Sequence, residues 1–209
     1  MAGKGRFITL EGGEGGGKST QARLLADALH ADGVSVVLTR EPGGAPGAEQ
    51  IRRLLVEGDV GRWDPMTEAL LHVAARRDHL VQTVWPALAD GKWVISDRFS
   101  DSTLAYQGYG HGLGVEPLER LHMLAVDGFL PDLTLILDLP VEEGLRRAAG
   151  RGGEDRYERM GGDFHQRLRD GFLAIARRHP DRCRLIDATA AVGEVQRRIM
   201  EELRTTFAL

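Results

Sequence analysis

The glycine-rich stretch at residues 12–19 contains the residue types that bind a nucleotide phosphate. It fits the spacing G-x-x-x-x-G-K-[ST], which ends here in Gly17, Lys18 and Ser19. Glycines allow backbone conformations that are closed to other residues, so successive N–H groups can point at one phosphate. Lys18 would reach the β- and γ-phosphates, and the Ser19 hydroxyl would face Mg²⁺. The residues expected to contact the donor nucleotide are Gly12, Gly13, Glu14, Gly15, Gly16, Gly17, Lys18, Ser19 and Thr20.

The segments on either side of this stretch favour a phosphate loop over a flexible linker. Residues 6–10 are apolar enough for a short buried strand. Residues 21–30 have the pattern of an amphipathic helix, whose apolar face consists of Leu24, Leu25, Ala28 and Leu29. A strand, a glycine loop and a helix in this order are the context in which such a loop binds phosphate.

The rest of the chain alternates between predicted strands and predicted helices. The further strands are expected at residues 34–39, 93–96, 133–138 and 183–187. The further helices are expected at residues 48–57, 65–89, 118–127, 141–149, 164–178 and 192–205. The long helix has an apolar stripe of Leu70, Val73, Ala74, Val81, Val84 and Leu88, and the four glycines of residues 108–114 predict a mobile loop. This alternation predicts an α/β fold, with a five-stranded parallel sheet and helices on both faces.

Composition limits the classes of protein to consider. A length of 209 residues is typical of one domain, which we expect to span residues 1–209. The net charge of −4 gives no reason to expect nucleic acid or an acidic membrane as a partner. No apolar stretch approaches the ~20 residues of a membrane span, so we expect a cytoplasmic protein. The single cysteine, Cys183, excludes an intrachain disulfide and a cysteine metal cluster.

Charged residues gather where the predicted strands end. In parallel sheets, ligands bind at the carboxyl ends of the strands. Asp97 ends the predicted strand at residues 93–96 and is the candidate carboxylate for Mg²⁺ beside Ser19, with Asp138 as a weaker candidate. Arg98 follows Asp97 and is well placed to bind an acceptor phosphate through two hydrogen bonds. The alternatives are that Asp97 caps a turn and that Arg98 pairs with a surface carboxylate.

Four segments together resemble one family, the bacterial thymidylate kinases. They are residues 7–20, residues 39–44, Asp97-Arg98-Phe99 with residues 102–107, and Arg151-Gly152 with Asp155-Arg156. The resemblance covers nearly the whole chain. It implies the three-layer fold of P-loop NTPases, ATP as phosphoryl donor, Mg²⁺ and a homodimer. It also implies transfer of the γ-phosphoryl group to dTMP, giving dTDP and ADP, in dTTP biosynthesis.

The same resemblance assigns roles around the acceptor. An acidic residue in the position of Glu14 would accept a hydrogen bond from the 3′-hydroxyl and touch the metal shell. His72 occupies a position where the family carries a Phe or Tyr that stacks on thymine, and Arg76 would bind the base. Imidazole offers less stacking area than those rings. The full set expected around dTMP is Glu14, Glu41, Pro42, His72, Arg76, Arg98, Ser102, Thr103, Tyr106 and Gln107.

A lid at about residues 146–160 is the expected source of further positive charge. Within the phosphate loop Lys18 is the only basic residue, and transferred phosphoryl groups are often stabilised by arginines. In the bacterial kinases that this chain resembles, the lid supplies that arginine. The expected catalytic residues are therefore Lys18, Arg98, Arg151 and Arg156.

Two other functions fit parts of the sequence. A kinase acting on adenylate or guanylate would share the loop, but the segment from Asp97 to Gln107 argues against it. A GTP-dependent switch protein would need an N-K-x-D motif for guanine. The sequence contains no asparagine, so that motif cannot be present.

Overall fold

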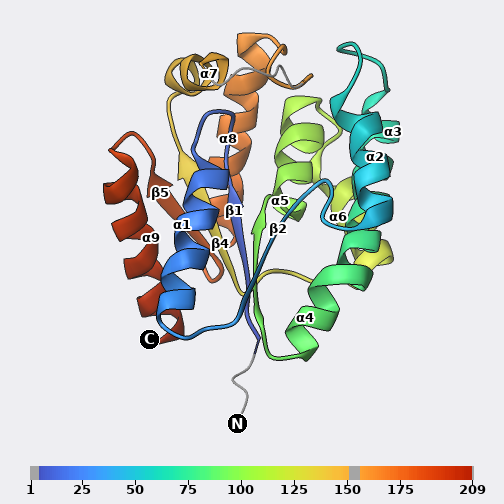
Figure 1. The fold of residues 1–209 in the computed structure, drawn as a ribbon. Helices are drawn as coiled ribbons and strands as arrows, with labels where there is room; N and C mark the ends of the chain where they lie inside the picture. Colours follow the sequence, from blue (N-terminus) through green and yellow to red (C-terminus); the bar gives the residue numbers. More distant parts are fainter. Residues whose placement is uncertain (1–4, 151–155, 209) are drawn as a thin grey trace.

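The computed structural model describes residues 5–150 and 156–208, and its centre is a parallel sheet (Figure 1). The strand order is β2-β3-β1-β4-β5, and all neighbours are parallel. The strands are β1 (Phe7–Glu11), β2 (Val36–Arg40), β3 (Trp93–Asp97), β4 (Leu133–Asp138) and β5 (Cys183–Asp187). This confirms the predicted α/β fold with a five-stranded parallel sheet.

Helices cover both faces of the sheet (Figure 1). The α-helices are α1 (Lys18–Ala31), α2 (Pro46–Val56), α3 (Pro65–His79), α4 (Trp85–Ala89), α5 (Ser100–Thr103), α6 (Val115–Val126), α7 (Val141–Ala149), α8 (Gly162–Arg178) and α9 (Val192–Phe207). Two π-helical segments, η1 (Leu80–Val84) and η2 (Leu104–Gly110), connect α3 to α4 and follow α5. Among these described helices, none is both long and apolar enough to cross a membrane.

The alternation of side chains along β1 produces a separate core on each face of the sheet. Ile8 and Leu10 point toward α1 and α9 and are completely buried there. Phe7 points to the other face and packs against η1 and Phe99. Successive side chains of a strand face opposite sides, so a strand covered by helices on both faces is apolar throughout.

The structure corrects two expectations about local structure. Residues 108–114 are not a mobile loop throughout, because η2 continues to Gly110 and buries Gly108 and Gly110. A Cβ on Gly110 would lie 2.6 Å from the ring of Phe164, so this glycine allows η2 to pack closely on α8. The apolar stripe predicted for the helix at residues 65–89 is also partly wrong, since Leu70 and Val81 are exposed. The inward face of α3 carries charged side chains instead, as described below.

Candidate active site

The phosphate loop runs from the end of β1 into α1 and requires glycine at two positions. Gly12 has φ 130°, and a Cβ there would lie 2.4 Å from the Leu137 carbonyl oxygen. Gly15 has φ 69°, and a Cβ there would lie 1.9 Å from the carbonyl oxygen of Gly144. Both positions therefore combine a left-handed backbone with a close approach to neighbouring chain. An anion bound by the loop would lie at the N-terminus of the 14-residue helix α1, where backbone N–H groups attract phosphate.

Lys18 lies at the start of α1 and folds back over the loop. Its Nζ donates a hydrogen bond to the Gly13 carbonyl oxygen at 2.6 Å, and the residue is only 7% exposed. Burial and the nearby Arg98 guanidinium lower the pKa of Lys18 to about 8, while Glu14 and Asp97 act in the opposite direction. A bound phosphate would stabilise the charged ammonium and raise the pKa of Lys18 again, so this site favours an anionic ligand.

Ser19 and Asp97 meet beside the loop, as a Mg²⁺ site requires. The Ser19 hydroxyl donates a hydrogen bond to Asp97 Oδ2, so two hard oxygen donors converge on one point. Residues 5–150 and 156–208 hold no cluster of three or more His, Cys, Asp or Glu side chains that could bind a metal by itself. Mg²⁺ in kinases is usually held by one or two carboxylates, waters and the substrate phosphates, so the pair fits this ion.

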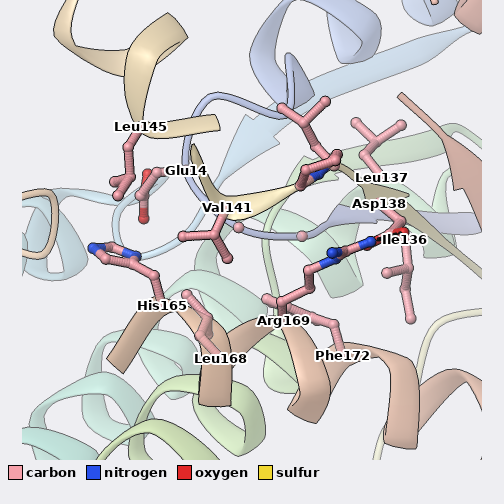
Figure 2. A pocket seen from close by; sticks show the side chains of 14 residues that line it. Glu14, Ile136, Leu137, Asp138, Val141, Leu145, His165, Leu168, Arg169 and Phe172 are labelled. Carbon is pink, nitrogen blue, oxygen red and sulfur yellow. Dashed lines mark hydrogen bonds and ion pairs between the residues drawn. The ribbon is translucent and has the colours of Figure 1, made fainter. Parts of the chain in front are cut away.

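Asp138, the weaker candidate for the metal, is held by α8. Its carboxylate accepts two hydrogen bonds from Arg169, at 2.8 and 2.9 Å. Figure 2 shows this pair at one end of a mainly apolar cleft between the phosphate loop, β4, α7 and α8. Glu14 and His165 lie toward the other end of the cleft (Figure 2). Because Arg169 already binds both oxygens of Asp138, Asp97 is the better candidate for a metal ligand.

Arg98 and Glu14 join the phosphate loop to a second pocket. Arg98 has φ 74°, an uncommon conformation for a residue other than glycine and one that is concentrated at functional sites. Its guanidinium donates to the Gly12 carbonyl oxygen at 3.1 Å and to Glu14 Oε1 at 3.0 Å. The hydroxyl of Tyr106 also donates to Glu14 Oε1. Burial alone would raise the pKa of Glu14, but Arg98 and Lys18 outweigh it and lower that pKa to about 2.

This second pocket, called the acceptor pocket below, contains every residue predicted to hold the acceptor. Its lining residues are Glu14, Glu41, Pro42, Arg52, Val56, His72, Arg76, Arg98, Phe99, Ser102, Thr103, Tyr106, Gln107 and Tyr157. The side chains come from the phosphate loop, the end of β2, α2, α3, the segment from the end of β3 through α5, η2 and the segment after α7. Arg52, Val56, Phe99 and Tyr157 were not predicted. The position of Arg52 on a helix close to Pro42 in sequence is a weak signal, and no pattern in the sequence points to Tyr157.

Arg76 is held in the acceptor pocket by a buried carboxylate. Its Nε donates to Glu41 Oε2 at 2.8 Å, and its NH2 donates to Thr103 Oγ1 at 2.9 Å. The second oxygen of Glu41 lies 2.9 Å from His79 Nδ1. Burial opposes the charge of Glu41, but Arg76 and His79 keep its pKa below the ordinary value. The guanidinium is therefore fixed as a hydrogen-bond donor at one wall of the pocket.

His72 forms a contact that the sequence did not predict. Its Nε2 lies 3.0 Å from the hydroxyl of Tyr157, which comes from the segment after α7. Burial lowers the pKa of His72 to about 4, so the ring is neutral near pH 7. The ring lines the acceptor pocket, and its stacking on a base stays a prediction.

We expect His72→Phe to lower the KM for dTMP, because phenylalanine offers a larger ring for stacking. The Tyr157 hydroxyl keeps a second partner, the guanidinium of Arg156 at 3.2 Å, so the pocket wall should survive the change. Steady-state kinetics on His72→Phe, with Tyr157→Phe as the control for the lost hydrogen bond, measure this. An unchanged KM would mean that His72 serves only to hold Tyr157.

The structure places Arg156 away from the phosphate loop. Its NH2 donates to Glu68 Oε2 on α3, and its Nε donates to the Leu55 carbonyl oxygen at 3.1 Å. Arg156 is 1% exposed, so it would have to leave Glu68 in order to reach a donor phosphate. Its predicted role at the donor phosphate therefore stays a prediction, and it requires a movement of the Arg156 side chain away from Glu68. Arg151, the other arginine of the lid that was predicted to be catalytic, lies outside the described residues.

A third pocket lies beside the second half of the phosphate loop. It is lined by Gly15, Gly16, Gly17, Thr20, Gln21, Arg147 and residues of the β5–α9 connection and the start of α9. Arg147 is anchored there, donating to Glu143 Oε1 at 2.8 Å and to the Ala188 carbonyl oxygen at 3.0 Å. The neighbouring Arg146 pairs with Glu143 at the surface.

The fold and the site define a class of protein. A parallel α/β sheet with a phosphate loop after β1, and an aspartate at the end of β3 that reaches the loop serine, is the arrangement of a P-loop nucleotide-binding enzyme. The structure of thymidylate kinase from Ehrlichia chaffeensis has the same fold. It matches with a TM-score of 0.77 and 38% identity, over 95% of this chain and 98% of that one.

Sequence comparisons lead from the class to the family. The thymidylate kinase family model matches residues 10–199. The thymidylate kinase of Caulobacter vibrioides is 56% identical over 92% of both chains. That of Rhizorhabdus wittichii is 53% identical over 95% of this chain and 97% of the relative. The chain belongs to the thymidylate kinase family, and it is an enzyme that transfers a phosphoryl group.

Proposed function

We propose that this enzyme transfers the γ-phosphoryl group of ATP to dTMP, with ATP on the phosphate loop and dTMP in the acceptor pocket. The observation that carries the proposal is the double contact of Arg98. One of its nitrogens binds Gly12 of the loop and another binds Glu14 in the pocket wall. A phosphate bound by Arg98 would therefore lie next to the γ-phosphate, as in-line transfer requires.

On the donor side, Lys18 and the loop N–H groups bind the β- and γ-phosphates. Ser19 and Asp97 would hold Mg²⁺, which neutralises charge on the phosphate oxygens when it is bound. The third pocket, beside Gly17 and with Arg147 at its edge, is suited to the donor nucleoside. Arg151 and Arg156 remain proposals as sources of further charge, and Arg156 would act only after release from Glu68.

On the acceptor side, each group in the pocket matches one part of dTMP. Arg98 binds the phosphate through its guanidinium. The ionised Glu14 would accept a hydrogen bond from the 3′-hydroxyl. Tyr106 lines the same pocket, and its ring packs against the Arg98 guanidinium, so it would lie beside the sugar. Arg76 donates to a carbonyl of the base, and His72 lies against the ring.

The test is ADP release, coupled to a spectrophotometric assay, with a panel of nucleoside monophosphates. We expect dTMP to be the preferred acceptor, with AMP and GMP inactive. Addition of EDTA should abolish turnover, and added Mg²⁺ should restore it. Equal rates with AMP or GMP, or full activity in EDTA, would contradict the proposal.

We also propose that the enzyme is cytoplasmic and that two copies of the chain pair through α3 and α6. Leu70 on α3 is 49% exposed, and Met123 and Leu124 on α6 are 61% and 83% exposed. The two helices pack together and are linked by Arg77, which donates to the Ala125 carbonyl oxygen at 3.1 Å. Exposed apolar side chains gathered on neighbouring helices are typical of an interface. Sedimentation velocity should show a dimer that Leu124→Arg dissociates, and a monomeric wild type would refute this.

A further inference from the structure

The side-chain amide of Gln107 has one satisfied end and one unsatisfied end. Gln107 lies on η2, is completely buried and lines the acceptor pocket. Its Nε2 donates a hydrogen bond to Glu68 Oε1 at 2.7 Å. Its Oε1 has no hydrogen-bond partner among residues 5–150 and 156–208. Buried polar atoms in folded proteins nearly always have a partner, so this oxygen is the group most in need of one in the pocket wall.

The carboxylate of Glu68 determines which end of the amide turns toward it. An ionised carboxylate only accepts hydrogen bonds, whereas an amide carries two donors on nitrogen and an acceptor on oxygen. Burial opposes the charge of Glu68, but His111, Gln107 and Arg156 outweigh it and lower its pKa to about 2. Gln107 must therefore present its NH2 group to Glu68 and keep its carbonyl oxygen for another partner.

A second carboxylate orients the neighbouring group in the same way. Glu41 holds Arg76 at 2.8 Å, and a guanidinium carries donors only. The pocket wall thus offers a donor from Arg76 and an acceptor from Gln107, and each is fixed by a buried glutamate. Its complement is a base edge with a carbonyl beside an N–H, the pattern of O4 and N3–H in thymine and uracil. Cytosine presents an amino group and a bare nitrogen at the same two positions.

We infer that Glu68 is a specificity-determining residue that selects a pyrimidine with an N3–H group by fixing the orientation of the Gln107 amide. The inference rests on the proposed function, since it concerns the base of the acceptor nucleotide. Glu68 is not among the residues that line the acceptor pocket, so it acts as a positioning residue. A site built to hydrogen-bond an N–H group discriminates strongly against an analogue that lacks it, because its own buried group is then left unpaired.

The test is the ratio of kcat/KM for dTMP to that for dCMP. Glu68→Gln places an amide where the carboxylate was, so that Gln107 can turn its oxygen toward residue 68 and its NH2 group toward the base. We expect kcat/KM for dTMP to fall by about tenfold or more, and the dTMP to dCMP ratio to fall by at least about tenfold. The dTMP to dUMP ratio should stay unchanged, because both bases present the same N3–H edge. An unchanged dTMP to dCMP ratio in a folded Glu68→Gln variant would overturn the inference.

Two further variants separate the role of Gln107 from other effects of Glu68. Glu68 also binds Arg156, and Arg156→Met removes that contact while keeping Glu68 and Gln107. If Arg156→Met lowers the dTMP to dCMP ratio as much as Glu68→Gln does, the selection runs through Arg156 and the inference is wrong. Gln107→Leu removes the acceptor itself and should lower the ratio even if Glu68→Gln fails to fold. In the Gln107→Leu background, adding Glu68→Gln should change the ratio no further, and a further fall would overturn the inference.

The wild type distinguishes this inference from the proposed function. If the wild-type enzyme does not phosphorylate dTMP, the proposed function fails. If it does, and both Glu68→Gln and Gln107→Leu keep the wild-type ratio, only the role of Glu68 fails.

Discussion

Replacing Lys18 with methionine is expected to abolish turnover and leave the protein folded. Lys18 is the one basic side chain of the phosphate loop, and its Nζ already lies over the loop, 2.6 Å from the Gly13 carbonyl oxygen. Without it, the negative charge that develops on the transferred phosphoryl group loses its nearest cation. We expect kcat to fall by about 10³-fold or more, a loss typical of removing charge stabilisation from such a site.

The fold should tolerate this change because methionine has a similar length and removes a buried charge. Thermal melting followed by circular dichroism should show no loss of stability relative to the wild type. Lys92→Met is the matched control, since Lys92 is half-exposed and pairs with Asp90 at the surface. A Lys18→Met enzyme that keeps a tenth of the wild-type kcat would contradict the assignment of the loop.

Replacing Arg98 with methionine should weaken use of the acceptor much more than use of ATP. Arg98 contacts Glu14 and Ser102 in the acceptor pocket, at 3.0 and 3.2 Å. Its loss removes the group proposed to bind the dTMP phosphate and also the cation nearest to Glu14. We expect kcat/KM for dTMP to fall by about 10³-fold, as for other arginines that stabilise a transferred phosphate.

The pH profile of the same variant provides an independent readout. Among the charges that lower the pKa of Glu14 against the effect of burial, Arg98 has the largest effect. The pKa of Glu14 should therefore rise in Arg98→Met. The ionised Glu14 accepts the 3′-hydroxyl more strongly than the protonated form, so activity should decline on the acid side at a higher pH than in the wild type. Arg178→Met, on the surface of α8, is the control. Equal rises in KM for ATP and dTMP would mean that Arg98 supports the phosphate loop and not the acceptor.

Local sequence was sufficient to predict the phosphate loop and most of the elements around it. The motif formed by Gly12, Gly17, Lys18 and Ser19 predicts a tight loop with glycine at strained positions. In the structure Gly12 and Gly17 have the positive φ angles that favour glycine. β4 (Leu133–Asp138) and β5 (Cys183–Asp187) begin and end where the apolar runs predicted them. The parallel strands then bring Asp97 to Ser19, because the carboxyl ends of neighbouring strands meet at one edge of the sheet.

Periodicity predicted α3 less well because it identifies apolar faces and not buried ion pairs. Leu70 is exposed, while Arg76 is buried because Glu41, from a distant strand end, neutralises it. A charged side chain can be buried only when an oppositely charged partner lies next to it. The spacing of residues along one helix does not reveal a partner that comes from another element. Glu68, His72 and Arg76 do recur every four residues on α3, so helical spacing could have placed Glu68 beside the site.

Only the tertiary structure decided how the acceptor pocket is closed and oriented. Arg156 was predicted to reach the donor phosphates, yet it lies on Glu68, 88 residues away in the sequence. Tyr157 lines the pocket and its hydroxyl contacts His72. The Gln107 side chain is oriented by its hydrogen bond to Glu68. These contacts join segments far apart in the chain, and each depends on hydrogen-bond geometry that exists only after the elements have packed. The sequence therefore determined which chemical groups are available, and the packing of α3, η2 and the segment after α7 determined which way they face.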